Sequence, residues 1–178
     1  MPSRHLIDIT DLSAQEWEDI TRLACDIGSH LDDYYGVCRG KILATLFYEP
    51  STRTQMSFQT AMLRLGGKTL GFAGAQLSSA SKGETVEDTA RVLSRYLDGI
   101  MIRTFAQQEV EDLARYGSIP IINGLTDFAH PCQVLADLMT IREHKGSLDG
   151  LKMCFIGDGN NMMNSLIVGC LKMKMEVA

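Results

Sequence analysis

The chain alternates short apolar runs with amphipathic stretches, and this alternation limits its possible folds more than any other feature. Parallel strands need a crossover connection, which a helix usually supplies. The pattern therefore predicts an α/β fold in which helices cover both faces of a parallel β-sheet. The expected strands are 42–47, 69–72, 99–102, 119–122 and 151–156, and the expected helices are 54–65, 86–96, 107–116 and 131–145.

A further helix is expected near the N-terminus. Ser13, followed three residues later by Glu16, matches a capping box, in which each side chain bonds a backbone N–H of the other residue. The apolar residues that follow recur at helical spacing, so this helix is expected to pack: Trp17, Ile20, Leu23, Ile27 and Leu31.

Composition narrows the function classes. A chain of 178 residues with 45% hydrophobic content is typical of a compact protein of one domain or slightly more. Its net charge of −5 argues against general binding to nucleic acids or anionic membranes, so an anionic ligand needs a local cluster such as Arg53, Lys82 and Arg103. No apolar run reaches the roughly 18 residues that span a bilayer, and the N-terminus lacks a secretory pattern, so a cytoplasmic location is expected.

The cysteines and histidines do not predict a metal site. The five cysteines are widely spaced without a C-x-x-C pair, and the four histidines do not cluster. Reduced thiols, no metal and no cofactor are therefore expected.

Residues 51–54 (Ser-Thr-Arg-Thr) lie between an expected strand and an expected helix. The first turn of a helix has unpaired N–H groups and the positive end of the helix dipole. Ser51, Thr52 and Thr54 add hydroxyl groups, and Arg53 adds a guanidinium that can bind two phosphate oxygens. The segment is therefore a candidate phosphate cradle. Its alternative interpretation is an N-cap beside a solvated arginine.

Other polar residues follow strands that are expected to end at the same edge of the sheet. These are Arg103, Thr104 and the segment from Asn123 onward. Ligands of parallel α/β sheets bind beyond the carboxyl ends of the strands, so these residues are expected to converge with 51–54. His130 lies just before a helix that begins with Pro131 and is expected to turn Leu135, Leu138 and Ile141 inward.

Five ordered segments resemble the transcarbamylase family, to which aspartate and ornithine carbamoyltransferases belong. They are Phe47 to Thr54, Leu77 to Thr89, Met101 to Thr104, Ile122 to Gln133 and Gly157 to Ser165. The resemblance implies that carbamoyl phosphate donates its carbamoyl group to an amine, and that the catalytic unit is a homotrimer with active sites between subunits.

The resemblance also implies a role for each matched residue. Ser51, Thr52, Arg53 and Thr54 would bind the phosphate, and Arg103 would reach the carbonyl oxygen. His130 would donate to that oxygen, and Gln133 would contact the carbamoyl nitrogen. Arg103, His130 and Thr54 would thus stabilise the oxyanion that forms when an uncharged amine attacks.

The resemblance indicates the reaction more clearly than the amine that accepts the carbamoyl group. Ser78 and Lys82 resemble a loop that enters the neighbouring subunit's site in aspartate enzymes, whereas 122–127, Cys132 and 157–161 resemble the ornithine type. Asn161 matches a residue that contacts the amino-acid substrate in ornithine enzymes. Ornithine is therefore the first expectation, with aspartate or putrescine as alternatives.

The chain is expected to contain a carbamoyl-phosphate-binding domain, 1–145, and the truncated beginning of an amino-acid-binding domain, 146–178. In the second segment 151–157, a helical stretch at 162–174 and 176–178 would form a β-α-β unit. A chain with so little of the second domain could also be a non-catalytic carbamoyl-phosphate-binding module.

Two other enzyme classes remain as alternatives. The run Gly157-Asp-Gly-Asn-Asn could be a dinucleotide-binding turn, although Met162 stands where a third glycine is expected. Cys132 and His130 could be a thiol nucleophile and its base, although residues two apart at a helix start point in different directions.

Overall fold

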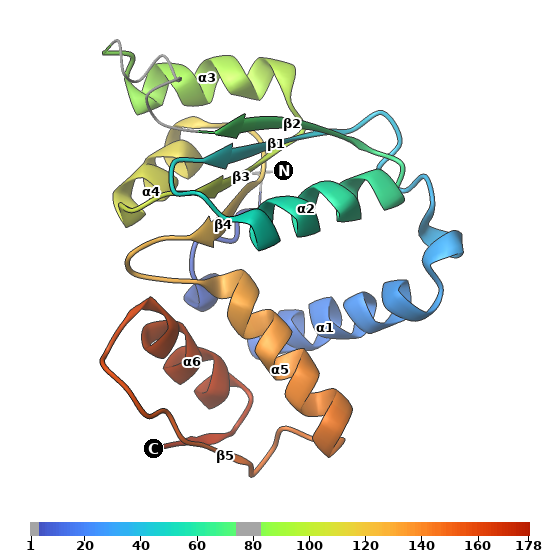
Figure 1. Cartoon of the computed structure of the whole chain (residues 1–178), viewed down its shortest axis with the longest axis vertical. Helices are drawn as coiled ribbons and strands as arrows, with labels where there is room; N and C mark the ends of the chain where they lie inside the picture. The colour runs from blue at the N-terminus through green and yellow to red at the C-terminus, as the bar shows by residue number, and fades with distance from the viewer. Residues whose placement is uncertain (1–3, 74–82) are drawn as a thin grey trace.

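The computed structural model describes residues 4–73 and 83–178, and its main body is a parallel sheet of four strands. The strands are β1 (Ile42–Phe47), β2 (Lys68–Ala73), β3 (Gly99–Arg103) and β4 (Ile121–Leu125), in the spatial order β2-β1-β3-β4. The helices α2 (Thr52–Arg64), α3 (Val86–Tyr96) and α4 (Gln107–Tyr116) connect them. Since α2 and α3 lie on opposite sides of the sheet, the predicted two-faced α/β fold is confirmed (Figure 1).

The strand order places a topological switch point between β1 and β3. From β1 the chain crosses to β2 on one side and then returns past β1 to β3 on the other. Connections that leave two neighbouring strands in opposite directions open a crevice beyond their carboxyl ends. The segments after β1 and β3, which begin with Tyr48 and Thr104, therefore flank the position where a ligand is expected.

Two strand predictions were wrong in their bounds. The strand expected at 119–122 begins at Ile121 and extends to Leu125, because Pro120 has no N–H to continue the ladder upstream. The strand expected at 151–156 is limited to β5 (Lys152–Met153), which pairs with β6 (Glu176–Val177). Beyond it the Phe155 N–H still donates to the carbonyl of Ala178 at 2.9 Å, while the Ile156 side chain is 93% exposed.

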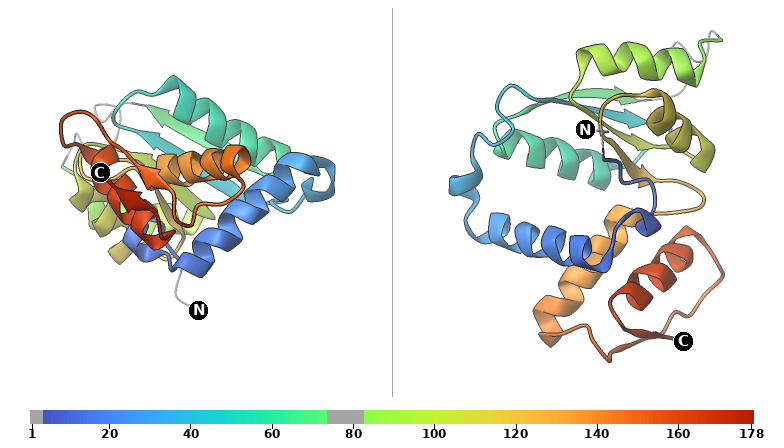
Figure 2. Two further views of the ribbon diagram at one scale, coloured as in Figure 1. Left: turned by 90° about the horizontal axis from the view of Figure 1, so that it is seen from below. Right: turned by 180° about the vertical axis from the view of Figure 1, so that it is seen from behind.

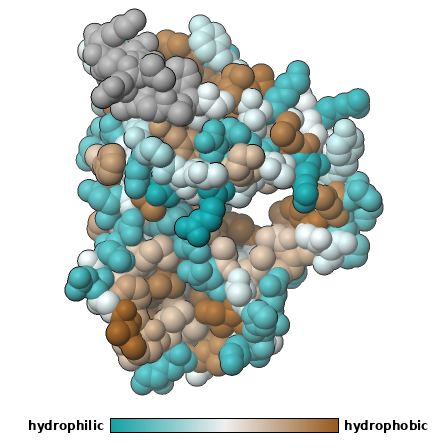
Figure 3. All heavy atoms as spheres, in the orientation of Figure 1, coloured by the Kyte–Doolittle hydropathy of each residue, from teal (hydrophilic) through white to brown (hydrophobic). Residues whose placement is uncertain are grey.

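The helix α1 (Ala14–Ser29) begins with the predicted capping box of Ser13 and Glu16. Trp17 is buried, so the expected packing of this helix is confirmed, although Ile20 and Leu23 of its apolar stripe are 38% and 49% exposed. The helix contacts α5 (Pro131–Lys145), and around Ala24 and Ile27 a groove of about 520 Å³ separates it from α2. The space-filling view shows the molecule hollowed there (Figure 3).

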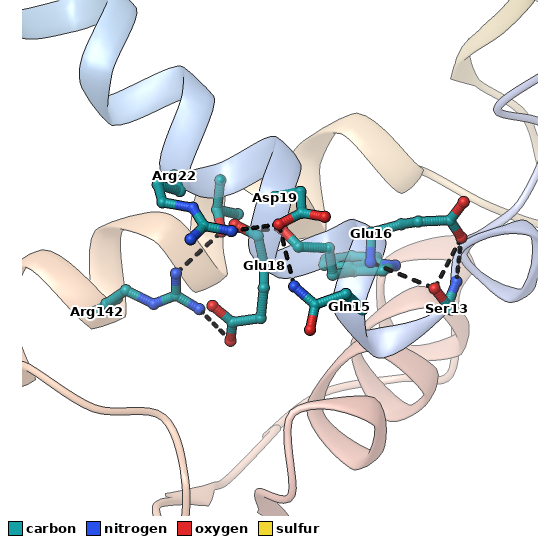
Figure 4. A network of polar contacts seen from close by, with 9 residues as sticks. Ser13, Gln15, Glu16, Glu18, Asp19, Arg22 and Arg142 are labelled. Atoms are coloured by element: carbon teal, nitrogen blue, oxygen red, sulfur yellow. Dashed lines mark hydrogen bonds and ion pairs between the residues drawn. The ribbon is translucent and has the colours of Figure 1, made fainter.

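A polar network fixes α1 on α5. The guanidinium of Arg142, on α5, donates to the carboxylate of Glu18 at 2.7 Å and to the hydroxyl of Thr21 at 3.0 Å. Both partners lie on α1, where Gln15 and Arg22 also bind Asp19 (Figure 4). These contacts join the two helices above the apolar cluster that they share.

The helix α6 (Asn161–Lys172) connects β5 to β6 along the chain. Apolar side chains gather around it at the lower left of the molecule (Figures 1 and 3). It packs on α5, and both views from other sides agree with this placement (Figure 2). The closest approach is at Gly169, where an added Cβ would lie 2.5 Å from Cγ1 of Val134. One cluster thus contains residues of α1, α5 and α6, among them Trp17, Val134, Leu138, Leu166 and Cys170.

No helix in the described ranges is long and apolar enough to cross a membrane. Within those ranges, no three histidine, cysteine, aspartate or glutamate side chains are grouped so that they could bind a metal ion.

Candidate functional site

The helix α2 begins one turn beyond β1 and leaves its first amides open. Ser51 is the N-cap, and its hydroxyl accepts the N–H of Thr54 at 3.4 Å and donates to the Thr54 hydroxyl at 3.0 Å. The N–H groups of Thr52 and Arg53 bond no atom of the described residues. The helix starts at Thr52 rather than at the expected residue 54, so Thr52 and Arg53 belong to its first turn. This is the geometry of an anion-binding helix terminus.

Arg53 adds a positive charge to this terminus. Its side chain is exposed and forms no ion pair with a described residue. A guanidinium without a carboxylate partner remains available for a phosphate.

Arg103, at the end of β3, is the second cation at this edge. Its side chain is only 15% exposed and pairs with Glu49 at 3.3 Å between Nη2 and Oε1. The backbone ties the two connections together, because the N–H of Tyr48 donates to the Arg103 carbonyl at 2.9 Å. Glu49 therefore holds the guanidinium in place from one side. The Nε of Arg103 is buried without a hydrogen-bond partner among the described residues.

His130 lies within range of the charges of Arg103 and Glu49. Its pKa is lowered to about 4, first because burial disfavours the imidazolium and second because the Arg103 guanidinium repels it, against the attraction of the Glu49 carboxylate. His130 is therefore neutral at pH 7. Its Nδ1 is buried and, within the described part of the chain, has no hydrogen-bond partner.

Of the other predicted site residues, two bond groups of the protein itself and two lie outside the described residues. The amide of Gln133 is exposed in the first turn of α5 and donates to the Asp137 carboxylate at 2.9 Å. Asn161 donates to the carbonyl of Thr126 at 2.6 Å, so it reaches the connection that leads to His130. Ser78 and Lys82 lie outside the described residues.

Sequence reasoning gave no role to three residues that shape this site. Glu49 lies in the segment quoted for the resemblance, and its nearness to Arg103 could have been expected from two adjacent parallel strands. Asn164 and Ser165 bond the connection before α5 at positions 35 or 36 residues away in sequence. Spacing along a chain carries no signal for contacts of that range.

The thiol alternative is not supported. Burial raises the pKa of the Cys132 thiol to about 12, and its Sγ donates to the carbonyl of Asn123 at 3.4 Å. A thiol with so high a pKa provides almost no thiolate at pH 7, and the thiolate is the nucleophile.

The dinucleotide alternative is not supported either. A dinucleotide turn uses the open N–H groups of the helix that follows it. At α6 the side chain of Asn160 already accepts from Met162 and Met163, at 3.0 and 3.1 Å. The protein itself therefore occupies the position of the anion.

The large cavities described in the molecule lie elsewhere. One of about 490 Å³ is bounded by α1, α5 and the end of α6, and the groove between α1 and α2 is about 520 Å³. Since neither contains the residues named above, the site is identified by its unpaired polar groups and not by cavity size.

The comparisons with known proteins find similar sequences and structures over most of the chain. A family model described as "Aspartate/ornithine carbamoyltransferase, carbamoyl-P binding domain" matches residues 4–143. An ornithine carbamoyltransferase of Carboxydothermus hydrogenoformans is 49% identical over 177 residues, which are 98% of this chain and 57% of the relative. The chain thus spans little more than half the length of that curated relative.

Solved structures also superpose on nearly the whole of this chain, which again spans little more than half of their length. The ornithine carbamoyltransferase of Pyrococcus furiosus superposes with a TM-score of 0.93 at 44% identity, over 99% of this chain and 57% of that one. The catalytic subunit of M. jannaschii aspartate transcarbamoylase gives 0.87 at 38% identity, over 98% of this chain and 59% of that one.

Proposed function

Because the chain belongs to the aspartate/ornithine carbamoyltransferase family, we propose that its strand-end site binds carbamoyl phosphate and transfers the carbamoyl group to an amine, first of all ornithine. One observation carries the proposal. Among the described residues three buried side-chain nitrogens have no hydrogen-bond partner, and two of them, Nε of Arg103 and Nδ1 of His130, are in this site. Buried polar atoms rarely remain unpaired, and a ligand, an ion or water usually binds those that the protein leaves open.

The phosphate would lie at the start of α2. The N–H groups of Thr52 and Arg53, the hydroxyls of Ser51, Thr52 and Thr54, and the Arg53 guanidinium supply donors for its oxygens. A doubly charged phosphate is favoured there by the helix dipole as well.

The carbamoyl group would point toward Arg103 and His130. An uncharged amine attacks the carbamoyl carbon, its electron pair forms the new C–N bond, and negative charge develops on the carbonyl oxygen. Arg103 and a neutral His130 can each donate to that oxygen, and each well-placed donor contributes on the order of 3 kcal/mol. The tetrahedral intermediate then collapses: the C–O bond to phosphate breaks, the phosphate leaves with the electron pair of that bond, and it takes up the proton that the attacking amine gives up.

The assignment of roles beyond these groups also rests on the resemblance. We propose that Gln133 rotates from Asp137 to the carbamoyl nitrogen, and that Asn161 contacts the amino acid. Ser78 and Lys82 would come from a neighbouring subunit of a cytoplasmic homotrimer. The division into domains 1–145 and 146–178 is part of the same proposal.

Ornithine is favoured because the relatives that bear that name reach 49% identity over nearly the whole chain. Aspartate remains the second candidate, since a structure titled aspartate transcarbamoylase aligns with 98% of the chain at 38% identity. A panel of ornithine, aspartate and putrescine, assayed with this chain and with a version extended to the length of its relatives, separates the candidates. Binding without transfer to any amine would leave a carbamoyl-phosphate-binding module.

Carbamoyl-phosphate titration by calorimetry, with a matched pair of variants, tests the binding step. Arg53→Ala removes a guanidinium at the start of α2, whereas Arg64→Ala removes an exposed one at its end. Loss of a charge-assisted hydrogen bond is worth roughly 1.5–3 kcal/mol, so Arg53→Ala should weaken binding about tenfold to a hundredfold. Equal affinities of the two variants would refute the phosphate site.

A further inference from the structure

The connection from β4 to α5, residues 126–130, is bound by the beginning of α6. The side chain of Asn161 donates to the carbonyl of Thr126 at 2.6 Å, and that of Asn164 donates to the carbonyl of Phe128 at 3.0 Å. The third contact reaches His130, whose backbone N–H donates to the hydroxyl of Ser165 at 2.9 Å. Three successive hydrogen bonds from one helix thus follow the connection up to His130.

The opposite end of the connection is fixed by α4 and by hydrogen bonds within the connection. The hydroxyl of Thr126 donates to the side-chain oxygen of Gln107, on α4, at 2.6 Å and accepts the N–H of Ala129 at 3.0 Å. The N–H of Thr126 also donates to the Ala129 carbonyl at 2.9 Å. The connection is therefore held from both sides, and Ser165 provides the bond nearest to His130.

Ser165 is itself rigidly placed. It is 1% exposed, and the next residue, Leu166, is buried in the cluster that α6 shares with α5. One turn later, Gly169 touches α5 so closely that no Cβ fits beside Val134. Because α5 starts at Pro131, directly after His130, the same two helices fix both the hydroxyl and the residue that it binds.

The imidazole has no such support of its own. Its Nδ1 bonds no described residue, so the ring direction depends on where the backbone of His130 is held. We propose that Ser165, assisted by Asn164, is a positioning residue that sets His130 for the reaction. The inference rests on the proposed carbamoyl transfer, because that is the reaction for which His130 would be positioned. The hydrogen bonds that support the inference are present whether or not the chain carries out that reaction.

This arrangement gives α6 an influence on the reaction without contact between Ser165 and the reacting atoms. An amino acid bound near Asn161 would lie on the same helix start that orients His130. A displacement of about 1 Å in a reacting group can cost on the order of a hundredfold in rate, so a hydrogen bond of this kind matters beyond stability.

The experiment compares Ser165→Ala with Ser94→Ala. Ser94 offers the same type of bond far from the site, because its hydroxyl, on α3, accepts the backbone N–H of Ser118 at 3.0 Å. Both variants remove one serine hydroxyl that holds a connection. The readout is the NMR titration of the His130 imidazole in the 178-residue chain without ligand.

In the unaltered chain the pKa of His130 is about 4, because of burial and Arg103. Ser165→Ala should move the titration midpoint upward toward the ordinary value, because the released backbone lets water reach the ring. Ser94→Ala should leave the midpoint unchanged. An unchanged midpoint in Ser165→Ala, at a melting temperature similar to that of Ser94→Ala, would overturn the proposal.

A second variant decides the question if Ser165→Ala does not fold. Asn164 is exposed, so Asn164→Ala removes the donor to Phe128 without adding a charge near His130. It should shift the His130 midpoint in the same direction by less, and no shift would count against the proposal. In the extended protein, Ser165→Ala should lower kcat by about tenfold to a hundredfold with KM for carbamoyl phosphate changed less than about threefold. If carbamoyl phosphate does not bind the unaltered chain, the proposed function fails, but the titration still tests the positioning.

Discussion

The starts of α2 and α6 look alike in sequence but differ in what they leave unbound. Each follows a strand, carries a polar N-cap, Ser51 or Asn160, and offers the positive end of a helix dipole. At α2 two amides are open, and an unpaired guanidinium stands beside them. At α6 the Asn160 side chain takes two amides, and Asn161 binds Thr126. A helix start serves as an anion site only where the protein has not already satisfied it.

The largest expected effect comes from closing one of the open amides. Thr52 is the first residue of α2, where proline fits, and Ser51 has the extended backbone that must precede a proline. Thr52→Pro therefore removes the N–H and the hydroxyl but keeps the helix. Binding of carbamoyl phosphate, measured by calorimetry, should weaken at least about tenfold, which corresponds to roughly 1.5 kcal/mol or more.

The matched control is Val86→Pro, at the first position of α3 behind a similarly extended Thr85. It should leave the affinity unchanged. Asn160→Ala, which frees the amides at the start of α6, should also leave it unchanged, because the first turn of α6, 161–164, contains no basic residue comparable to Arg53. An affinity for carbamoyl phosphate that rises in Asn160→Ala, or that is unchanged in Thr52→Pro, would contradict the assignment of the anion site to α2 and not to α6.

The next effect concerns how firmly α6 is seated. Gly169→Ala places a methyl group against Val134, and overpacking of this kind costs about 1–3 kcal/mol. Gly28→Ala, in α1, meets no atom within 4 Å and should stabilise the chain by roughly 0.5–1 kcal/mol through helix propensity. Urea unfolding of both variants measures the difference. A stable Gly169→Ala would show that α6 is not fixed on α5.

A smaller effect is expected from the pH dependence of stability. The folded-state pKa of His130, about 4, lies below the unfolded value near 6.5, so the unfolded state binds the proton first as pH falls. The unaltered chain should therefore lose stability between about pH 6.5 and pH 4. Full burial would make this loss about 3 kcal/mol, and solvent screening of a partly exposed ring reduces it to about 1–2 kcal/mol.

His130→Asn removes this titration. Its free energy of unfolding should fall less than that of the unaltered chain over the same pH range, when both are measured by urea unfolding. Identical pH slopes would mean that His130 is not held neutral by burial and Arg103.

Much of the fold could be predicted from local patterns. The periodicity of 86–96 and 107–116 gave the bounds of α3 and α4, and Pro131 marked the first residue of α5. The exceptions have tertiary causes. Ile20 and Leu23 have the spacing of a buried stripe, but only the folded chain shows that α1 contacts α5 and leaves these two side chains exposed.

Part of the proposed site follows from sequence motifs. Ser51 and Arg53 follow β1, Arg103 ends β3 and His130 follows β4, so the parallel strands place all four beyond the carboxyl ends of the sheet. The roles of Glu49 and Ser165 depend on an ion pair across two connections and a hydrogen bond across 35 residues. Neither kind of contact leaves a local pattern.

If carbamoyl phosphate bridges the start of α2 and the Arg103–His130 pair, a crystal structure of the chain with this ligand should show the bridge. Phosphate oxygens are expected within hydrogen-bond distance of the N–H groups of Thr52 and Arg53, and the carbonyl oxygen is expected to face Arg103 and His130. A ligand bound at the start of α6, or at α2 with its carbonyl turned away from both side chains, would contradict this arrangement.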